Sequence, residues 1–164
     1  MSFTGDYHLD TEILLEYIKN LKYNTATARM KKFNIKRSVG GSILYGDTWR
    51  SYLSKNKNRE YDEKRKKYLT EVKRLNPKLQ SVFEEFRDFH FPHFHFTQVQ
   101  LNKNYKIPRH IDSQNIGDSV LVCCGNYEGG LTCIEKENGI EKRDARKQPV
   151  IFNGSKYYHY VEDF

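Results

Sequence analysis

Cysteine and long apolar stretches are scarce in this chain of 164 residues. Its three cysteines, Cys123, Cys124 and Cys133, are clustered and odd in number, which argues against a disulfide framework and fits a reducing compartment. No apolar stretch is long enough to cross a bilayer, and the first residues lack the basic and apolar segments of a secretory signal. These absences predict an intracellular protein, cytoplasmic or nuclear, that carries neither a membrane segment nor a secretion signal.

Tryptophan occurs once, but the chain has 12 Tyr and 10 Phe residues. The mean hydropathy of -0.84 is that of a polar chain, yet this number of aromatic side chains is enough to build a core and excludes a disordered protein. The length suits one domain with one core. We therefore predict a single domain spanning residues 1–164, with a helical support region at 1–91 and a β core at 92–164.

In one segment of the chain, acidic residues are too few to balance the positive charge of the basic ones. Residues 49–78 carry 11 Lys and Arg but 4 Asp and Glu, and this excess equals the net charge of +7 for the whole protein. A basic segment from Arg50 to Lys78 can attract nucleic-acid phosphates. The plainer interpretation is a solvated, lysine-rich helix face, and both interpretations stay open.

Apolar periodicity predicts helices in the first half. Asp10 is expected to cap the first helix. The second is expected over Glu60 to Leu75, and the third starts at Pro77, where proline is tolerated in the first turn. The side chains expected to face the core are Ile13, Leu14, Tyr17, Ile18 and Leu21 in the first helix, Tyr61, Tyr68, Leu69, Val72 and Leu75 in the second, and Leu79, Val82, Phe83, Phe86 and Phe89 in the third.

Short segments typical of strands follow Pro92, separated by turn signals such as Asn138-Gly139 and Asn153-Gly154. Several short strands at such spacing favour a β-sandwich or barrel. The predicted fold class is therefore α+β, with helices first and a compact β core after them. The strand candidates are 94–101, 106–112, 119–124, 131–135, 149–153 and 156–161, and a shorter apolar run lies at Ser42 to Tyr45.

His110, Asp112 and His159 have the residue types of a metal site with two imidazoles and one carboxylate. Residues i and i+2 of a strand point to the same face, so His110 and Asp112 would project together, and His159 on a later strand would supply the third ligand. This ligand set suits Fe(II) with open positions better than a structural zinc ion, which usually has four N or S ligands. A lone His-x-Asp is weak, and a buried histidine is more often a hydrogen-bonded core residue, so the order of all three carries the prediction.

A second group of histidines, His90, His93 and His95, competes for a metal role. His93 and His95 also stand at i and i+2, but no carboxylate shares their strand, and Pro92 marks its entrance. We favour a structural role for these histidines, with the wall of an aromatic-lined cavity as the alternative. Cys123 and Cys124 are expected to face opposite sides of a strand and to act as buried thiols.

The segment 92–164, less than half of the chain, contains a set of motifs in a fixed order. They are Phe96-Thr97-Gln98-Val99-Gln100-Leu101-Asn102, His110-x-Asp112, Asn115, Gly117, Ser119, Gly125, Tyr127-x-Gly129-Gly130-Leu131, and Phe152-Asn153-Gly154 before His159. With these motifs the segment resembles the Fe(II)/2-oxoglutarate-dependent dioxygenases. Within that superfamily it looks most like the nucleic-acid-modifying TET/JBP-like branch and its viral and protist relatives.

The resemblance implies a double-stranded β-helix of the jelly-roll or cupin type, with the N-terminal helices buttressing it. It also implies that His110, Asp112 and His159 hold Fe(II), that 2-oxoglutarate chelates the metal, and that O2 is consumed to oxidise a substrate C–H bond. The chain departs from the family at its end, because Phe164 stands five residues after His159, where the family places a last strand with an Arg or Lys that anchors 2-oxoglutarate. The β core is therefore expected to be incomplete. Lys136 is the substitute anchor, and Asn102, Tyr105 and Ser119 are the further contacts expected for the co-substrate.

A nucleic-acid base, such as a methylpyrimidine, is the favoured substrate, since an enzyme that takes a base out of its stack needs basic and aromatic contacts. A protein or peptide hydroxylase of the prolyl type is the alternative within this chemistry. A catalytically inactive double-stranded β-helix that binds a ligand is the alternative outside it. Zinc-dependent hydrolysis is weaker, because no glutamate stands beside a histidine pair in the manner of the helical zinc motif.

Overall fold

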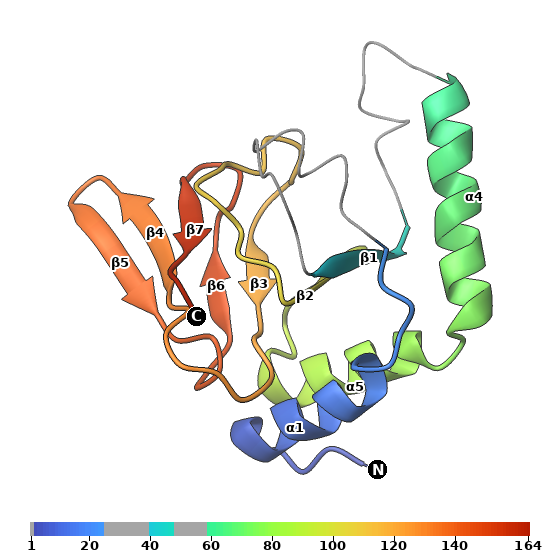
Figure 1. Cartoon of the computed structure of the whole chain (residues 1–164), viewed down its shortest axis with the longest axis horizontal. Coiled ribbons are helices and arrows are strands. Elements are labelled where there is room, and N and C mark those ends of the chain that lie inside the picture. Colours follow the sequence, from blue (N-terminus) through green and yellow to red (C-terminus); the bar gives the residue numbers. More distant parts are fainter. Residues whose placement is uncertain (1, 25–39, 48–58) are drawn as a thin grey trace. The chain divides into compact units, whose positions relative to one another are not determined.

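The computed structural model describes residues 2–24, 40–47 and 59–164, which form three helices and antiparallel strands (Figure 1). The chain divides into two compact units that interleave along the sequence: Met1–Asn20, Phe89–Phe91 and Tyr105–Phe164 make the first, and Leu21–Asp88 and Pro92–Asn104 make the second. The mixed helix and strand class predicted from the sequence is confirmed. The single domain of residues 1–164 stays a prediction. Among the described residues, no helix has the length and apolar composition needed to cross a membrane.

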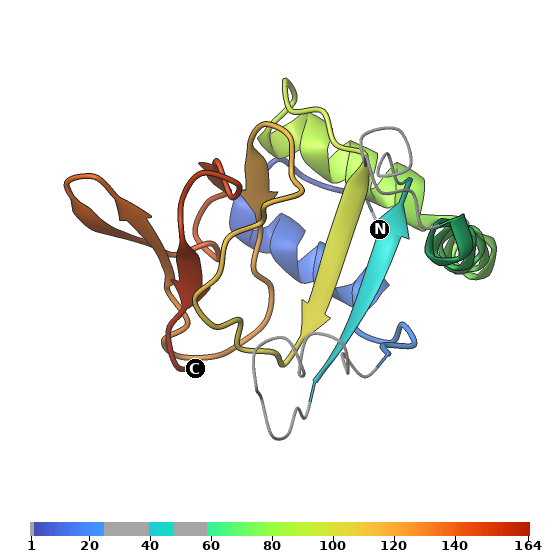
Figure 2. The ribbon, with the colours of Figure 1, turned by 90° about the horizontal axis from the view of Figure 1, so that it is seen from above.

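The second unit is built on a two-stranded antiparallel ladder. Strand β1 (Gly41–Gly46) pairs with β2 (Gln98–Lys103), and Figure 2 shows the two strands side by side. The apolar run at residues 42–45 is therefore a strand, and its alternation buries Ile43 and Tyr45 on one face. The ring of Tyr45 meets Phe83 of helix α5 (Leu79–His90) edge-on, with 5.5 Å between the ring centroids. Aromatic pairs of this geometry stabilise a core beyond the area that they bury.

Helices α4 (Arg59–Leu75) and α5 agree with the predicted periodicity. Leu69 and Val72 of α4 are buried, as are Leu79, Val82, Phe83 and Phe86 of α5. The prediction was wrong for Leu75, which is 58% exposed, because it lies six positions after Leu69 and so about 120° around the helix from it. Phe89 is also exposed, at 48%. The side chain of Tyr61 and the segments 25–39 and 48–58, including Arg50 and the basic residues that follow it, lie outside the described residues.

The N-cap of helix α1 (Tyr7–Ile18) in the first unit lies four residues before the predicted cap Asp10. Asp6 is the N-cap, and its carboxylate accepts a hydrogen bond from the backbone N–H of Leu9. Asp10 instead lies inside the first turn and is fully buried. Its carboxylate accepts hydrogen bonds from Thr4 and Gly5 and pairs with Nε2 of His90 at 2.8 Å. Both aspartates suit a helix start, and the local sequence did not separate the two roles.

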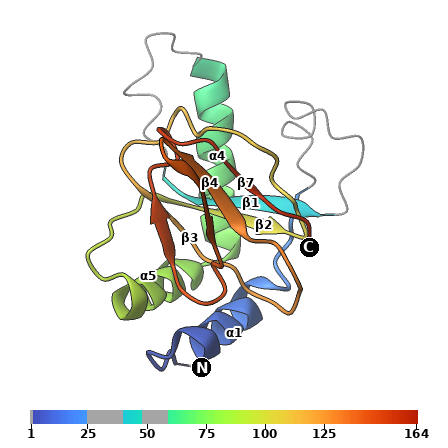
Figure 3. The same ribbon diagram turned by 90° about the vertical axis from the view of Figure 1, so that its left-hand side faces the viewer.

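Two antiparallel ladders form the rest of the first unit. The sheet order is β5 (Gly139–Arg143), β4 (Thr132–Lys136) and β7 (His159–Val161), and β3 (Ser119–Leu121) pairs with β6 (Val150–Phe152). Figure 3 shows β3, β4 and β7 from the side. Ile134 of the first ladder packs with Val150 and Phe152 of the second. This cluster joins the two ladders, and neither ladder closes into a barrel within the described ranges.

One predicted strand is absent from the structure, and one observed strand was not predicted. The segment 106–112 forms no regular strand: it meets β7 through one hydrogen bond at Ile107 and an isolated bridge at His110. Pro108 lies between these two residues and has no N–H to donate, which interrupts the ladder. Strand β5 was not predicted, although Asn138-Gly139 marked the turn, and Lys136 pairs with Gly139 across a two-residue loop.

Candidate metal centre

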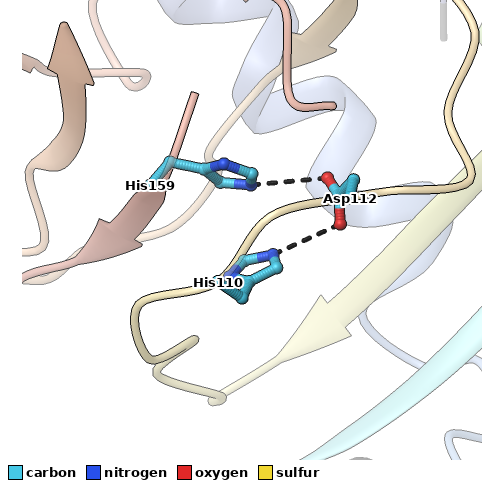
Figure 4. Close-up of side chains that lie close together, drawn as sticks. All are labelled: His110, Asp112 and His159. Carbon is cyan, nitrogen blue, oxygen red and sulfur yellow. Dashed lines mark ion pairs between the residues drawn. The ribbon is translucent and has the colours of Figure 1, made fainter. Parts of the chain in front are cut away.

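His110, Asp112 and His159 converge in the first unit, as Figure 4 shows. His110 and His159 face each other across the isolated bridge, where each backbone N–H donates to the carbonyl of the other at 3.0 Å. The N–H of Asp112 donates to the carbonyl of Gly154 at 2.8 Å. Backbone hydrogen bonds therefore fix all three residues, although His110 and Asp112 do not lie on a regular strand.

The distances within the triad suit three ligands of one ion. Nε2 of His110 lies 3.3 Å from Oδ1 of Asp112, and Nε2 of His159 lies 3.4 Å from Oδ2. One ligand atom from each residue can be chosen so that all lie within 4.8 Å of one another. Ligand bonds of about 2.1 Å at right angles place neighbouring ligand atoms roughly 3 Å apart. Small side-chain adjustments would therefore close the triad around a cation.

The other ring nitrogens orient the two imidazoles. Nδ1 of His110 lies 2.8 Å from the carbonyl of Pro108, and Nδ1 of His159 lies 2.9 Å from the carbonyl of Tyr157. A carbonyl can only accept, so each Nδ1 carries a proton and donates it, which leaves Nε2 as the ring atom that faces Asp112. Metal-binding histidines commonly donate their second ring N–H to a backbone carbonyl in this way. Both Nε2 atoms thus face the carboxylate of Asp112.

The two rings lie close together, with 4.2 Å between their centroids. Two imidazole nitrogens and one carboxylate within reach of one another are a donor set that fits a divalent ion.

Charge and burial act in opposite directions on the pKa values of the triad. Burial would raise the pKa of Asp112, but hydrogen bonds and attraction from His110 and His159 hold the pKa well below its usual range. Burial would lower the pKa of His159, but hydrogen bonding with Asp112 and with the carbonyl of Tyr157 raises the pKa overall. Asp112 is therefore ionised at neutral pH and available to a cation.

Gly154 permits the close approach of the backbone to the triad. It stands in the turn between β6 and β7, where Oδ1 of Asn153 accepts from the N–H groups of Ser155 and Lys156. A Cβ on Gly154 would lie 3.0 Å from Oδ2 of Asp112 and 3.5 Å from Cε1 of His159. A side chain at this position would therefore push on two of the three ligands.

Arg109, which precedes His110, makes an exposed cation–π contact and an ion pair. The guanidinium of Arg109 lies 3.9 Å from the ring centroid of Tyr158 and makes two hydrogen bonds of 2.7 Å with Glu135. Arg109 precedes His110, and Tyr158 precedes His159, so this stack joins the two ligand-bearing segments a second time.

Of the four residues expected to contact the co-substrate, one lies beside the triad. Ser119 borders the triad, because its Oγ lies 3.5 Å from the Cβ position of Gly154, and it accepts a hydrogen bond from Asn115. Tyr105 belongs to the same unit and is buried, and its hydroxyl has no hydrogen-bond partner among the described residues. Lys136 ends β4 and forms an ion pair of 2.5 Å with Glu141. Asn102 belongs to the second unit. The structure thus brings Ser119 to the triad.

The competing groups have other surroundings. His90 pairs with the buried Asp10, which fits the structural role predicted for it. His93 and His95 are exposed, and neither belongs to a group suited to a metal in the described part of the chain. All three cysteines are free thiols, Cys133 buried and the other two half-buried.

Sequence reasoning missed two features beside the triad. The ring of Phe152 packs edge-on against His159, with 4.8 Å between centroids. The role of Gly154 was also missed, although Asn153-Gly154 had been noted as a turn, because only the folded chain shows what a glycine approaches. Neither a family model, nor a curated protein, nor a solved structure matches this chain.

Proposed function

We propose that this protein is an Fe(II)- and 2-oxoglutarate-dependent oxygenase that hydroxylates a C–H bond of a nucleic-acid base, most simply the methyl group of a methylpyrimidine. The observation that carries the proposal is the convergence of His110, Asp112 and His159, with both Nε2 atoms facing the carboxylate. Two imidazoles and one carboxylate on one side of an ion leave positions for a chelating co-substrate and O2.

The residues would divide the work as their contacts indicate. His110, Asp112 and His159 would hold the ion, the carbonyls of Pro108 and Tyr157 would fix the ring orientations, and Phe152 would shield one side of His159. When bound, Fe(II) and 2-oxoglutarate supply the oxidising power, with one atom of O2 entering the substrate and the other entering succinate as CO2 is released. The two facing ladders would belong to a double-stranded β-helix.

The basic surface of α4 supports nucleic acid as the substrate class. Lys64, Lys66 and Lys67 are exposed within two turns of this helix. Further along the helix, Lys73 and Arg74 form ion pairs with Asp47 and Glu71. Clustered, exposed lysines attract phosphates without sequence preference, and such binding weakens steeply with salt.

The direct test supplies Fe(II), 2-oxoglutarate, O2 and an oligonucleotide with 5-methylpyrimidines, and follows both the succinate formed and the mass of the nucleic acid. The proposal expects one added oxygen atom per modified base, and no product with Asp112→Ala. Hydroxylation of peptides but not of the oligonucleotide would contradict the substrate class. Iron binding without succinate from any substrate would instead favour a non-catalytic binding domain.

A further inference from the structure

Strand β3 directs the side chain of Ser119 toward the triad. Ser119 is the first residue of β3, and it pairs with Phe152 of β6. Directly opposite side chains of an antiparallel pair lie on the same face. The ring of Phe152 is buried against His159, whereas Ile151, which alternates with Phe152, is 53% exposed. Ser119 therefore points to the same side as the ring that meets His159.

The hydroxyl of Ser119 and the carboxylate of Asp112 border the same point. A Cβ built on Gly154 would lie 3.0 Å from Oδ2 of Asp112 and 3.5 Å from Oγ of Ser119. Because glycine has no side chain, no atom of residue 154 occupies that point between the two groups. A small rotation of the carboxylate or of the hydroxyl can therefore bring the two groups together.

Asn115 connects this serine to the ligand-bearing segment. Its backbone N–H donates to the carbonyl of Asp112 at 2.9 Å, and its side-chain amide donates to Oγ of Ser119 at 3.1 Å. The amide uses an acceptor position of the hydroxyl and leaves the hydroxyl proton for another acceptor. In the described part of the chain, no carbonyl or carboxylate accepts that proton. The hydroxyl is thus held beside Asp112 as an available donor.

Asp112 requires a donor of this kind when an ion binds. In the structure, Nε2 of His110 lies beside one carboxylate oxygen and Nε2 of His159 beside the other, as Figure 4 shows. A histidine that ligates an ion gives the ion its lone pair, so neither ring can then donate to the carboxylate through Nε2. Asp112 offers the ion one oxygen, and the other oxygen keeps part of the negative charge. Ligating carboxylates in metal sites are themselves hydrogen-bonded.

We propose that Ser119 is a positioning residue of the metal centre, whose hydroxyl donates to the oxygen of Asp112 that does not ligate the ion. Asn115 would keep the hydroxyl proton directed at the carboxylate by occupying the acceptor side. The inference rests on the metal centre of the function proposed above, but it concerns the ion alone and needs no co-substrate. It differs in this respect from the contact with 2-oxoglutarate that the sequence suggested for Ser119.

Metal affinity measured without 2-oxoglutarate separates the two roles of this serine. Co(II) serves as the probe, because it accepts the same nitrogen and oxygen ligands, is stable in air and absorbs visible light in a way that depends on its ligands. The full chain is titrated with Co(II), and the dissociation constant is read from the visible bands and from calorimetry. Ser119→Ala should weaken binding by roughly 10–100-fold, the usual effect of removing a partner of a metal ligand.

Further variants assign this loss to the hydroxyl group. Ser119→Thr keeps the hydroxyl and should recover most of the affinity for Co(II). Asn115→Ala should weaken binding by a smaller factor, because the hydroxyl remains but loses the amide that orients it. Ser113→Ala is the matched control, since this serine is exposed in the same loop, and it should leave the affinity unchanged. Circular dichroism and the melting temperature of each metal-free variant report its fold.

The outcomes distinguish this inference from the proposed function. Wild-type affinity for Co(II) in Ser119→Ala, with weaker binding of 2-oxoglutarate, would overturn the positioning role and leave the oxygenase intact. A loss that Ser119→Thr does not recover would also overturn it, because the hydroxyl would then not be the group responsible. The expected series of Co(II) affinities in a protein that oxidises no substrate would support the positioning role and contradict the oxygenase. No Co(II) binding by the wild type would remove both.

Discussion

A methyl group at position 154 would press on the carboxylate of Asp112. The Cβ of alanine there would lie 3.0 Å from Oδ2, closer than ordinary contact, and 3.5 Å from Cε1 of His159. The backbone of residue 154 cannot retreat easily, because its carbonyl accepts the hydrogen bond from the N–H of Asp112. The carboxylate must therefore rotate or shift by a few tenths of an ångström.

Such overpacking typically costs about 1–3 kcal/mol. Since the metal requires Asp112 at a fixed position between two rings, we expect most of this cost to fall on the metal-bound form. The affinity of Gly154→Ala for Fe(II) should then drop by roughly fivefold to a hundredfold. Anaerobic calorimetric titration measures this affinity, and thermal unfolding of the metal-free protein reports the effect on the fold.

Lys156→Ala is the matched control, because it lies in the same turn but is exposed. It should leave the affinity for Fe(II) unchanged. An unchanged affinity in Gly154→Ala, with the melting temperature also unchanged, would refute the inference that Gly154 sets the position of Asp112.

Three further predictions concern other parts of the fold. Asp10→Asn should lower the free energy of unfolding by about 2–3 kcal/mol at neutral pH, because the hydrogen bonds to this carboxylate hold its pKa below the usual value. In the wild-type protein this contribution is complete above about pH 4 and is lost as the pH falls toward the lowered pKa. Acid titration of stability should therefore show the loss in the wild type and not in the variant. Phe83→Ala should cost about 3–5 kcal/mol in urea unfolding, since it removes a buried ring that packs on Tyr45, and a change below 1 kcal/mol would contradict the described core. Arg109→Ala removes an exposed contact with Tyr158 and Glu135, so its effect on unfolding should be much smaller than that of Phe83→Ala. A weaker affinity of this variant for Fe(II) would indicate that the contacts of Arg109 help to align the two histidines.

Local sequence patterns were sufficient for the helices and for the identity of the three candidate ligands. The period of Leu69 and Val72, and that of Leu79, Val82 and Phe86, follows directly from burying one side of a helix. Spacing also brought His110 and Asp112 together in the prediction, and the structure shows both near His159. The strand expected around His110 was nevertheless absent, because Pro108 interrupts the ladder while isolated backbone bonds still hold the ligands.

The features that the sequence did not reveal depend on contacts between residues that are far apart in the chain. The partnership of Thr132 with Arg143 depends on the register of β4 and β5, which becomes visible only once Gly139 is placed opposite Lys136. Asp6 and Asp10 are both suitable caps, and the structure pairs Asp10 instead with His90, which lies 80 residues further along the chain. The close approach of Gly154 to Asp112 likewise joins segments that are distant in sequence.

The central claim is that His110, Asp112 and His159 hold Fe(II) in a form that accepts 2-oxoglutarate. The most direct measurement is an anaerobic titration of the protein with Fe(II) and then with 2-oxoglutarate, recorded by visible absorption, for the wild type and for His110→Ala and Asp112→Ala. We expect a charge-transfer band in the wild type that is absent from both variants, while all three proteins have the same circular dichroism spectrum. Failure of the wild type to bind Fe(II), or a band that persists without His110 and Asp112, would contradict the assignment.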